Sequence, residues 1–306
     1  MARTTIDSLL GQLPRTDKQI EAAQPPPPPD APKKKREPDW DPTGAGSKFT
    51  APDGELAETL AKKALAGGRA SLLDLLARIR DVADPSDDYR PEYLLHLVVV
   101  YAGSVKGARY RKSVASVLAE QIRSPKPSVG ARQILIRELQ WIGGSAAIDE
   151  LAALLADENY CADASIALLA IGKDTAPAFR KALPNATSNC RAGIIVALGQ
   201  LRDTKSAELF RRALADSDMD VRLSAAWALA RLGDGQSAQG LLALASATSG
   251  YSQAKATQAC LMLAENMAAA GRKNEGLELY DGIRRQTKEK YIRDIASKAI
   301  GALEPS

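Results

Sequence analysis

The side chains that most often carry chemistry are sparse in this sequence. Its 306 residues include one histidine, His96, and three cysteines, Cys161, Cys190 and Cys260. A histidine can act as a general base or bind a metal, but both roles need partner side chains at a fixed geometry. His96 stands in the apolar run from Leu94 to Val100, so we expect a half-buried core or groove residue. We therefore predict no catalytic site, no metal site and no cofactor, and thus a protein that is not an enzyme.

Other signatures of chemistry are also missing from the sequence. It has no glycine-rich phosphate loop, no nucleophile elbow and no paired-carboxylate motif. The cysteines lack CxxC spacing, and an odd, sparse set predicts reduced thiols in a cytosol-like compartment. No run approaches the roughly 20 apolar residues of a membrane helix. The first twenty residues have no continuous apolar core, so no signal peptide is expected. We predict a cytoplasmic protein without a membrane partner.

A short pattern that recurs four times organises the chain. Its anchors lie 29, 30 and 31 residues apart and are Arg132, Cys161, Arg191 and Arg222. A leucine follows each anchor by seven residues, as Leu139, Leu168, Leu198 and Leu229. Small or apolar residues stand three and ten residues after the anchors, and these spacings place the side chains on one face of a helix. We expect the helices to end at Gly143, Gly172 and Gly233, where glycine tolerates a positive φ. Arg202 breaks that rule in the third copy.

A second helical run follows the first in every copy. The residues that carry it are Ile148, Leu151 and Leu154, then Ala176, Phe179 and Ala182, then Ala207, Phe210 and Ala213, then Ala238, Leu241 and Leu244. Each unit therefore reads as helix, turn, helix and loop. One such pair cannot bury its apolar face alone, so a fixed period of this length predicts stacked copies. The apolar share of 45% and the aromatic share of 5% suit close packing of helices.

The residues from Asp220 to Asp234, DVRLSAAWALARLGD, resemble the short HEAT-like repeats of the phycobilisome-lyase type. The segment from Lys48 to Val100 is similar to the opening of a group of bacterial HEAT-repeat proteins. The resemblance implies an all-α fold, a right-handed α-solenoid of HEAT-like helix pairs. Most proteins with such repeats are interaction proteins rather than lyases, so it favours a partner-binding role.

The composition divides the chain into two parts. Residues 1–52 predict a disordered tail rich in proline and lysine, with a possible short helix over Ile6–Leu13. The tail contains the run Pro25–Pro29 and the basic run Lys33–Arg36. Three interpretations stay open: a solvated linker, a docking helix with a proline spacer, and a nuclear-localisation signal. Residues 53–306 predict the solenoid, with Arg90 as a fifth anchor. The clearest repeats span 131–247, and 248–306 predict looser helices that cap the stack.

We predict a non-enzymatic scaffold or adaptor that binds a protein partner through the solenoid surface. If the second helix of each unit lines the groove, its exposed polar residues are the candidates for that contact. They are Glu150, Arg180, Lys181, Glu208, Arg211, Arg212 and Gln239.

Two alternatives remain at this stage. A nucleic-acid-binding protein would use the basic residues of 101–130, which are Lys106, Arg109, Arg111, Lys112, Arg123 and Lys126. The net charge of +4 does not by itself indicate nucleic acid. Arg191 and Arg222 are interpreted instead as partners of loop carboxylates such as Asp157, Asp216 or Asp218. A bilin lyase, which would bind an acidic tetrapyrrole, is the remote alternative.

Overall fold

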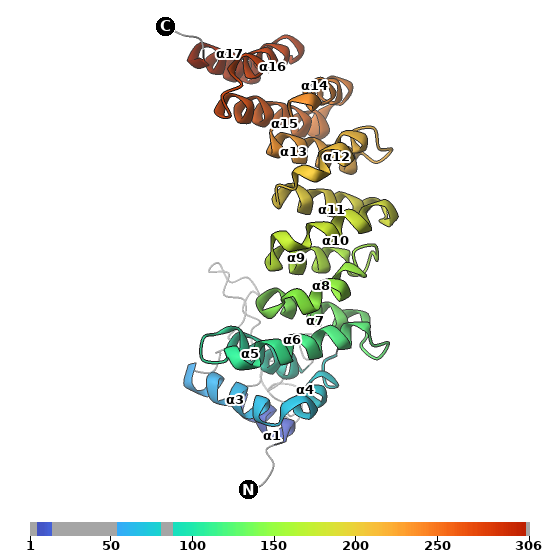
Figure 1. Cartoon of the computed structure of the whole chain (residues 1–306), viewed down its shortest axis with the longest axis vertical. Helices are drawn as coiled ribbons and strands as arrows, with labels where there is room; N and C mark the ends of the chain where they lie inside the picture. Colours follow the sequence, from blue (N-terminus) through green and yellow to red (C-terminus); the bar gives the residue numbers. More distant parts are fainter. Residues whose placement is uncertain (1–4, 14–53, 81–87, 304–306) are drawn as a thin grey trace, which may run out of the picture. The chain divides into compact units, whose positions relative to one another are not determined.

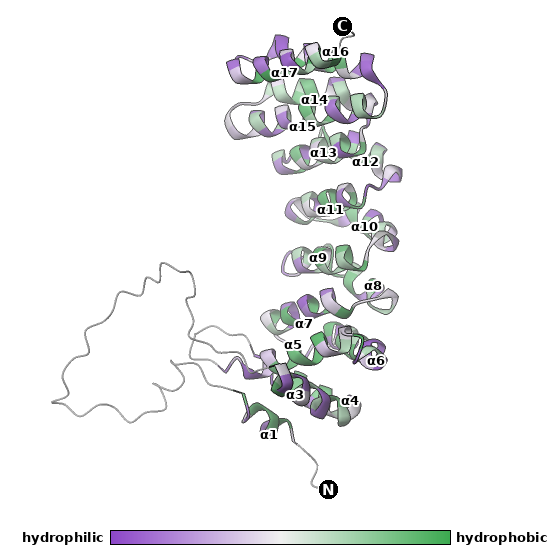
Figure 2. Cartoon of the chain, turned by 90° about the vertical axis from the view of Figure 1, so that its left-hand side faces the viewer, coloured by the Kyte–Doolittle hydropathy of each residue, from purple (hydrophilic) through white to green (hydrophobic). Residues whose placement is uncertain are grey.

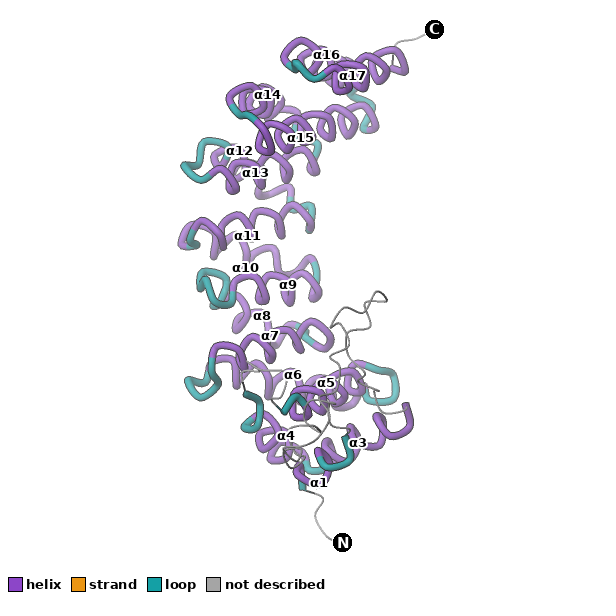
Figure 3. Tube along the Cα trace, turned by 180° about the vertical axis from the view of Figure 1, so that it is seen from behind, coloured by secondary structure: helices purple, strands orange, loops and turns teal. Residues whose placement is uncertain are grey.

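Helices form the part of the chain that the structure describes. The computed structural model describes residues 5–13, 54–80 and 88–303, and these ranges contain helices joined by short loops and no strand (Figure 3). The predicted all-α fold is confirmed. The chain divides into two compact units, unit 1 over residues 1–147 and unit 2 over residues 148–306. Across the described ranges, every helix is too short or too polar to cross a membrane.

Unit 1 begins with a short helix and continues with helix pairs. Its helices are α1 (Ile6–Leu10), α3 (Gly54–Ala66), α4 (Gly68–Leu76), α5 (Arg90–Gly103), α6 (Ala108–Arg123) and α7 (Val129–Ile142). Helix α3 packs against α4 and α5, and α7 packs against α5 and α6. Helix α5 begins at the fifth anchor, Arg90, and ends at Gly103, as the register predicts.

A short helix, α1 (Ile6–Leu10), lies within the range 6–13 where the sequence predicts one, and it packs against its own chain. Ile6, Leu9, Leu10 and Leu13 are all buried, and α1 contacts α3, α4 and α5. The Thr5 hydroxyl caps the helix by accepting a hydrogen bond from the backbone N–H of Ser8. The predictions of a disordered segment, of extended prolines at 25–29 and of a basic signal at 33–36 lie outside the described residues.

Unit 2 is built from alternating long and short helices. After α8 (Ser145–Ala152), at the junction of the units, come α9 (Cys161–Ile171), α10 (Ala176–Ala182), α11 (Ser188–Gln200), α12 (Ala207–Ala213), α13 (Met219–Leu232), α14 (Ala238–Ala247), α15 (Gly250–Ala269), α16 (Lys273–Gln286) and α17 (Lys290–Leu303). Helices α9, α11, α13 and α15 form one layer, the long-helix layer, and α10, α12 and α14 form the short-helix layer (Figure 1). Helix α16 packs on α15, and α17 packs on α16.

The apolar positions of the repeat form the core of unit 2. Leu168, Leu198 and Leu229 are fully buried on successive long helices, and Phe179 and Phe210 are fully buried on successive short helices. Hydrophobic residues gather where neighbouring helices of this unit meet (Figure 2). The spacing of three and seven residues therefore places the same face of every copy against its neighbours, as predicted.

The ends of the long helices differ from the glycine rule in two places. Gly172 and Gly233 have φ of 109° and 69°, as expected, but Gly143 has φ of −53°. Helix α7 does end at Gly143, as predicted, but the expected positive φ is absent because the chain leaves the helix in an extended conformation. Arg202 is the opposite case, with φ of 52°. The N–H of Asp203 reaches back to the Leu198 carbonyl at 3.1 Å, so the third copy keeps the left-handed end without glycine.

A buried hydroxyl marks the turn from each long helix to its short helix in unit 2. Thr175, Ser206 and Ser237 stand 31 residues apart and are buried. Thr175 donates to the Gly172 carbonyl at 2.7 Å, and Ser237 donates to the Asp234 carbonyl at 2.6 Å. Each of these buried hydroxyls is therefore hydrogen-bonded at its turn, as buried polar groups usually are.

Side chains of one repeat also complete the helix ends of the preceding repeat. Arg231 of α13 donates to the Gly199 carbonyl of α11 at 3.2 Å. Asn266 of α15 donates to the Ala230 carbonyl of α13 at 2.8 Å, and Arg272 donates to the Gly233 carbonyl. The last carbonyls of a helix have no partner within that helix, so these donors join consecutive copies.

Candidate protein-binding surface

The long-helix layer of unit 2 contains a hollow of about 470 Å³ between α11, α13 and α15. We call it the α13 hollow. Its lining is Val196, Asp220, Leu223, Ser224, Trp227, Tyr251, Lys255, Gln258 and Ala259. Half-buried side chains such as Leu223 and Trp227 form the floor, while the exposed Asp220, Tyr251 and Lys255 stand at the rim. This mixture is typical of a surface that binds a protein side chain or a peptide.

The repeat itself explains why these residues share a surface. Asp220, Leu223 and Trp227 stand three and seven residues apart, so they lie on one face of α13. Val221 and Leu229 of the same helix point into the core and are fully buried. The hollow is therefore the outer face of the long-helix layer, at positions where the copies differ in sequence.

Trp227 is held in place by contacts with the preceding repeat. The guanidinium of Arg231 lies 5.4 Å from the centre of the Trp227 ring, and the same side chain donates to the Gly199 carbonyl. A Cβ atom at Gly199 would lie 2.7 Å from Cζ3 of Trp227. Glycine thus lets the ring lie against the backbone of α11, which fixes one wall of the hollow.

Tyr251 and Lys255 form the opposite rim. The side chain of Tyr251 is 72% exposed although it is large and mostly apolar. The Lys255 ammonium lies 5.5 Å from the centre of its ring. A partner group that approaches this rim meets an aromatic face and a cation together.

The predicted candidates on the short helices lie in the other layer. Arg180 of α10 forms an ion pair with Asp203 at 2.5 Å, and Arg211 of α12 forms one with Asp234 at 2.8 Å. These pairs join a short helix to the turn of the following repeat. The hydrogen bond that Arg211 donates to Asp234 raises the pKa of Arg211. Both arginines thus have a structural role in joining consecutive repeats.

The remaining candidate residues differ in their contacts and in their exposure to solvent. Glu208 pairs with Arg211 and with Arg212, both at 3.1 Å, and these hydrogen bonds lower the pKa of Glu208. Lys181 and Gln239 are exposed, and Glu150 is half-buried on α8. The structure therefore brings Glu208, Arg211 and Arg212 together on α12.

The predicted basic patch divides between the two ends of α6. Arg109, Arg111 and Lys112 lie near its start, next to Lys106, whereas Arg123 lies at its end, next to Lys126. A helix of 16 residues is about 24 Å long, so the groups do not form one concentrated patch.

Contacts with neighbours also engage several of these cations. Lys106 pairs with Glu58 at 2.8 Å and, together with Lys62, lowers the pKa of Glu58 to about 2. Arg109 lies over the ring of Tyr110 at 4.6 Å, and Arg111 donates to the Ile142 carbonyl at 3.4 Å.

One anchor arginine confirms the interpretation of the repeat's cations. Arg191 pairs with Asp216 at 2.6 Å, which lies in the loop of the next copy, and donates to the Ala186 carbonyl. Arg132 donates to the Ser124 carbonyl at 2.8 Å in the loop before its own helix. These cations join loops rather than project towards a ligand.

His96 is half-buried on α5, as predicted, and forms a hydrogen bond with a buried carboxylate. Its Nδ1 lies 3.1 Å from Glu138 Oε1 of α7, and its ring meets Trp141 edge-on with centroids 5.7 Å apart. The hydrogen bond to Glu138 raises the pKa of His96, while burial raises the pKa of Glu92. In the described ranges, the His, Cys, Asp and Glu side chains nowhere form a group of three suited to a metal.

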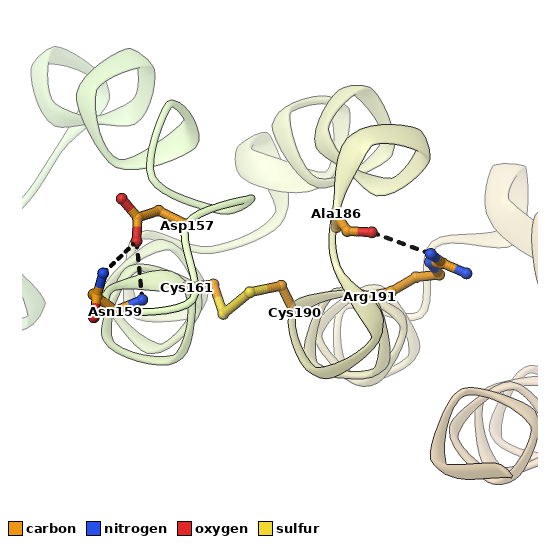
Figure 4. Close-up of a disulfide and its surroundings, with 6 residues drawn as sticks. All are labelled: Asp157, Asn159, Cys161, Ala186, Cys190 and Arg191. Atoms are coloured by element: carbon orange, nitrogen blue, oxygen red, sulfur yellow. Dashed lines mark hydrogen bonds between the residues drawn. A yellow bond between two sulfur atoms is a disulfide. The ribbon is translucent and has the colours of Figure 1, made fainter. Parts of the chain in front are cut away.

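The prediction of reduced thiols is wrong for two cysteines. Cys161 and Cys190 form a disulfide that joins α9 to α11 (Figure 4). They occupy nearly equivalent places in consecutive copies, which brings their side chains together across two packed helices. Cys260 is a free thiol, and burial raises its pKa to about 12, so it is unreactive.

Several residues of this surface escaped the sequence analysis. The acidic partners Asp203 and Asp234 are 31 residues apart, as are the hydroxyls of Ser206 and Ser237, and this spacing would have revealed them. Trp227 and Tyr251 offered a weaker signal, since both are aromatic residues in a chain with few of them.

A comparison with known protein families identifies repeats in this part of the chain. Residues 176–260 match the family model of HEAT repeats. No curated protein matches the sequence. A complex of CpcE and CpcF of phycocyanin lyase from Nostoc sp. PCC7120 is a structural neighbour with 17% identity and a TM-score of 0.31. The match covers 91% of this chain and 100% of the other. All nine residues that line the α13 hollow lie within the segment 176–260, which belongs to the HEAT repeats.

Proposed function

We propose that the chain is a scaffold that binds a protein partner through the α13 hollow. The observation that carries the proposal is the group Leu223, Trp227 and Tyr251, which forms an apolar and aromatic surface around a hollow of about 470 Å³. Tryptophan and tyrosine dominate the binding energy at many protein interfaces because they bury a large area. Stacked helical repeats form extended binding surfaces, and residues 176–260 match the HEAT repeats.

The rim defines what the partner would present. Lys255 favours a carboxylate or a carbonyl oxygen, and Asp220 favours a donor. An apolar side chain flanked by such groups would fill the hollow and replace the water that covers it. The partner segment thus has one apolar anchor between a donor and an acceptor.

The other predicted contact residues give less support to a role in binding a partner. Arg180 and Arg211 already pair with Asp203 and Asp234, so their replacement would disturb the packing of repeats as well as any partner. Lys181, Arg212 and Gln239 remain exposed candidates on the short-helix layer. The divided basic residues of α6 do not favour nucleic acid, and no described observation favours a bilin ligand.

Site-specific photocrosslinking in the native cell tests the proposal. A photoreactive amino acid at Leu223 is expected to trap one discrete partner, and a matched probe at the exposed Gln236 beside the short-helix layer is not. The Trp227→Ala and Tyr251→Ala variants should reduce that crosslink at least tenfold, as loss of interface hot spots does. The Lys181→Glu/Arg212→Glu variant should leave it unchanged. A crosslink from Gln236 that the Lys181→Glu/Arg212→Glu variant removes would assign binding to the short-helix layer.

A further inference from the structure

The N-terminal helix α1 lies on a surface made by α3, α4 and α5, although residues 14–53 separate it from α3 in the sequence. The buried residues of this segment follow a regular pattern. Ile6, Leu9, Leu10 and Leu13 lie at positions i, i+3, i+4 and i+7 and are at most 7% exposed. The residues between them are exposed. The segment therefore binds unit 1 as an amphipathic helix binds a groove.

Two polar contacts fix how the segment lies in this groove. Arg78 forms an ion pair with Asp7 at 2.9 Å. Arg90 lies 3.5 Å from the Leu10 carbonyl, one of the acceptors at the end of the helix. The groove thus supplies a cation for an acidic residue near the helix start and a cation for the carbonyls at its end, which sets the direction of the helix.

We propose that unit 1 has a second binding site, a groove for an amphipathic helix of another protein, which α1 occupies in the free chain. The ligand has apolar residues at i, i+3, i+4 and i+7 and an acidic residue at i+1, as α1 does. The bound segment shows that the groove accepts this chemistry, and nothing in the contacts requires the ligand to belong to the same chain.

Because α1 is short, a helix of a partner can displace it from the groove. A helix of five residues is far shorter than the length at which isolated helices are stable. Docking therefore orders the whole segment 5–13, and the entropy lost offsets much of the gain from burying four apolar side chains. A partner helix that is already formed avoids that loss and competes with the tethered segment.

A peptide of residues 5–13 tests whether the groove works between molecules. The full chain with Leu9→Asp/Leu10→Asp leaves the groove intact but removes its own ligand. We expect the labelled peptide to bind this variant saturably in fluorescence anisotropy. The wild-type chain and the Gln12→Asp chain, which changes an exposed residue of the same segment, should bind at least tenfold more weakly because α1 competes at an effective concentration on the order of 1 mM. Circular dichroism confirms that each variant is folded, and Ile6→Asp/Leu13→Asp serves as a second variant.

A charge exchange identifies the site of binding. Arg78→Glu in the Leu9→Asp/Leu10→Asp chain should weaken binding of the peptide, and an Asp7→Lys peptide should restore it. The proposal is overturned if neither of the two variants binds the peptide at up to about 1 mM protein. It is also overturned if all chains bind equally, or if the charge exchange has no effect, because the peptide would then lie elsewhere.

Discussion

Reduction of the disulfide between Cys161 and Cys190 should destabilise the first repeats of unit 2. The two residues are separated by 29 positions. In the chain-entropy description, closing a loop of that length removes about 12 cal/mol/K from the unfolded chain, which is about 3.6 kcal/mol at 25 °C. Measured values scatter from roughly 2 to 4 kcal/mol. Because a repeat array can open locally, we expect the loss to be concentrated in α9 and α11.

The experiment compares one protein in two redox states, so that both states have the same side chains apart from the disulfide. A Cys260→Ala background removes the third thiol from the assay. Urea unfolding followed by circular dichroism should show a lower midpoint after reduction. Hydrogen exchange should show faster opening of α9 and α11, with α16 and α17 unchanged. Titration of the unfolded, unreduced wild-type chain should give one free thiol. Three free thiols, or identical midpoints in the two states, would refute the reasoning.

Three further predictions concern single contacts. Gly199→Ala should destabilise unit 2 by about 1–3 kcal/mol, because its Cβ would lie 2.7 Å from the Trp227 ring. The control Gly193→Ala on the same helix meets no atom within 4 Å and should stabilise the unit by up to about 1 kcal/mol. Urea midpoints that shift in the same direction for both variants would contradict this prediction. Glu138 raises the pKa of His96, so the stability from this hydrogen bond is complete below about pH 6.5 and is lost as the pH rises through the pKa of His96 in the folded protein. NMR of the only histidine measures that pKa, and thermal unfolding of His96→Gln should lack this pH dependence. An unshifted histidine pKa would contradict the prediction. Arg211→Ala and Asp234→Ala should each lower the melting temperature, and the double variant should lose less than their sum because the two side chains form one pair; strict additivity would show that the pair is not coupled.

The helices could be predicted because their signal is local and periodic. The leucines at 168, 198 and 229 and the phenylalanines at 179 and 210 repeat at the spacing of one helix face, and each is fully buried. The length of α5 followed from Arg90 and Gly103 for the same reason. Every copy packs against its neighbours, so the same pattern of buried residues recurs in each repeat and can be recognised in a single sequence.

The surface was harder to predict because it depends on contacts between copies. Arg180 and Arg211 read as free groove cations until Asp203 and Asp234 appear beside them from the following repeat. The disulfide likewise depends on the distance between two packed helices, which CxxC rules do not address. Arg202 shows a third limit, since backbone hydrogen bonds held its left-handed conformation where the sequence offered no glycine.

In unit 2, side chains of one repeat donate hydrogen bonds to the C-terminal carbonyls of the preceding long helix, so these bonds all run in one direction along the array. Gly199 and Ala230 present carbonyls that Arg231 and Asn266 of the following helices satisfy. A copy lost from the C-terminal side bares acceptors beside a packed helix, where water must replace a fixed partner. A copy lost from the N-terminal side removes the acceptors of these donors, and it also removes the arginine that pairs with a turn carboxylate such as Asp203 or Asp234. The two sides of the array therefore expose different unpaired groups when a copy is lost, helix carbonyls on the C-terminal side and turn carboxylates on the N-terminal side.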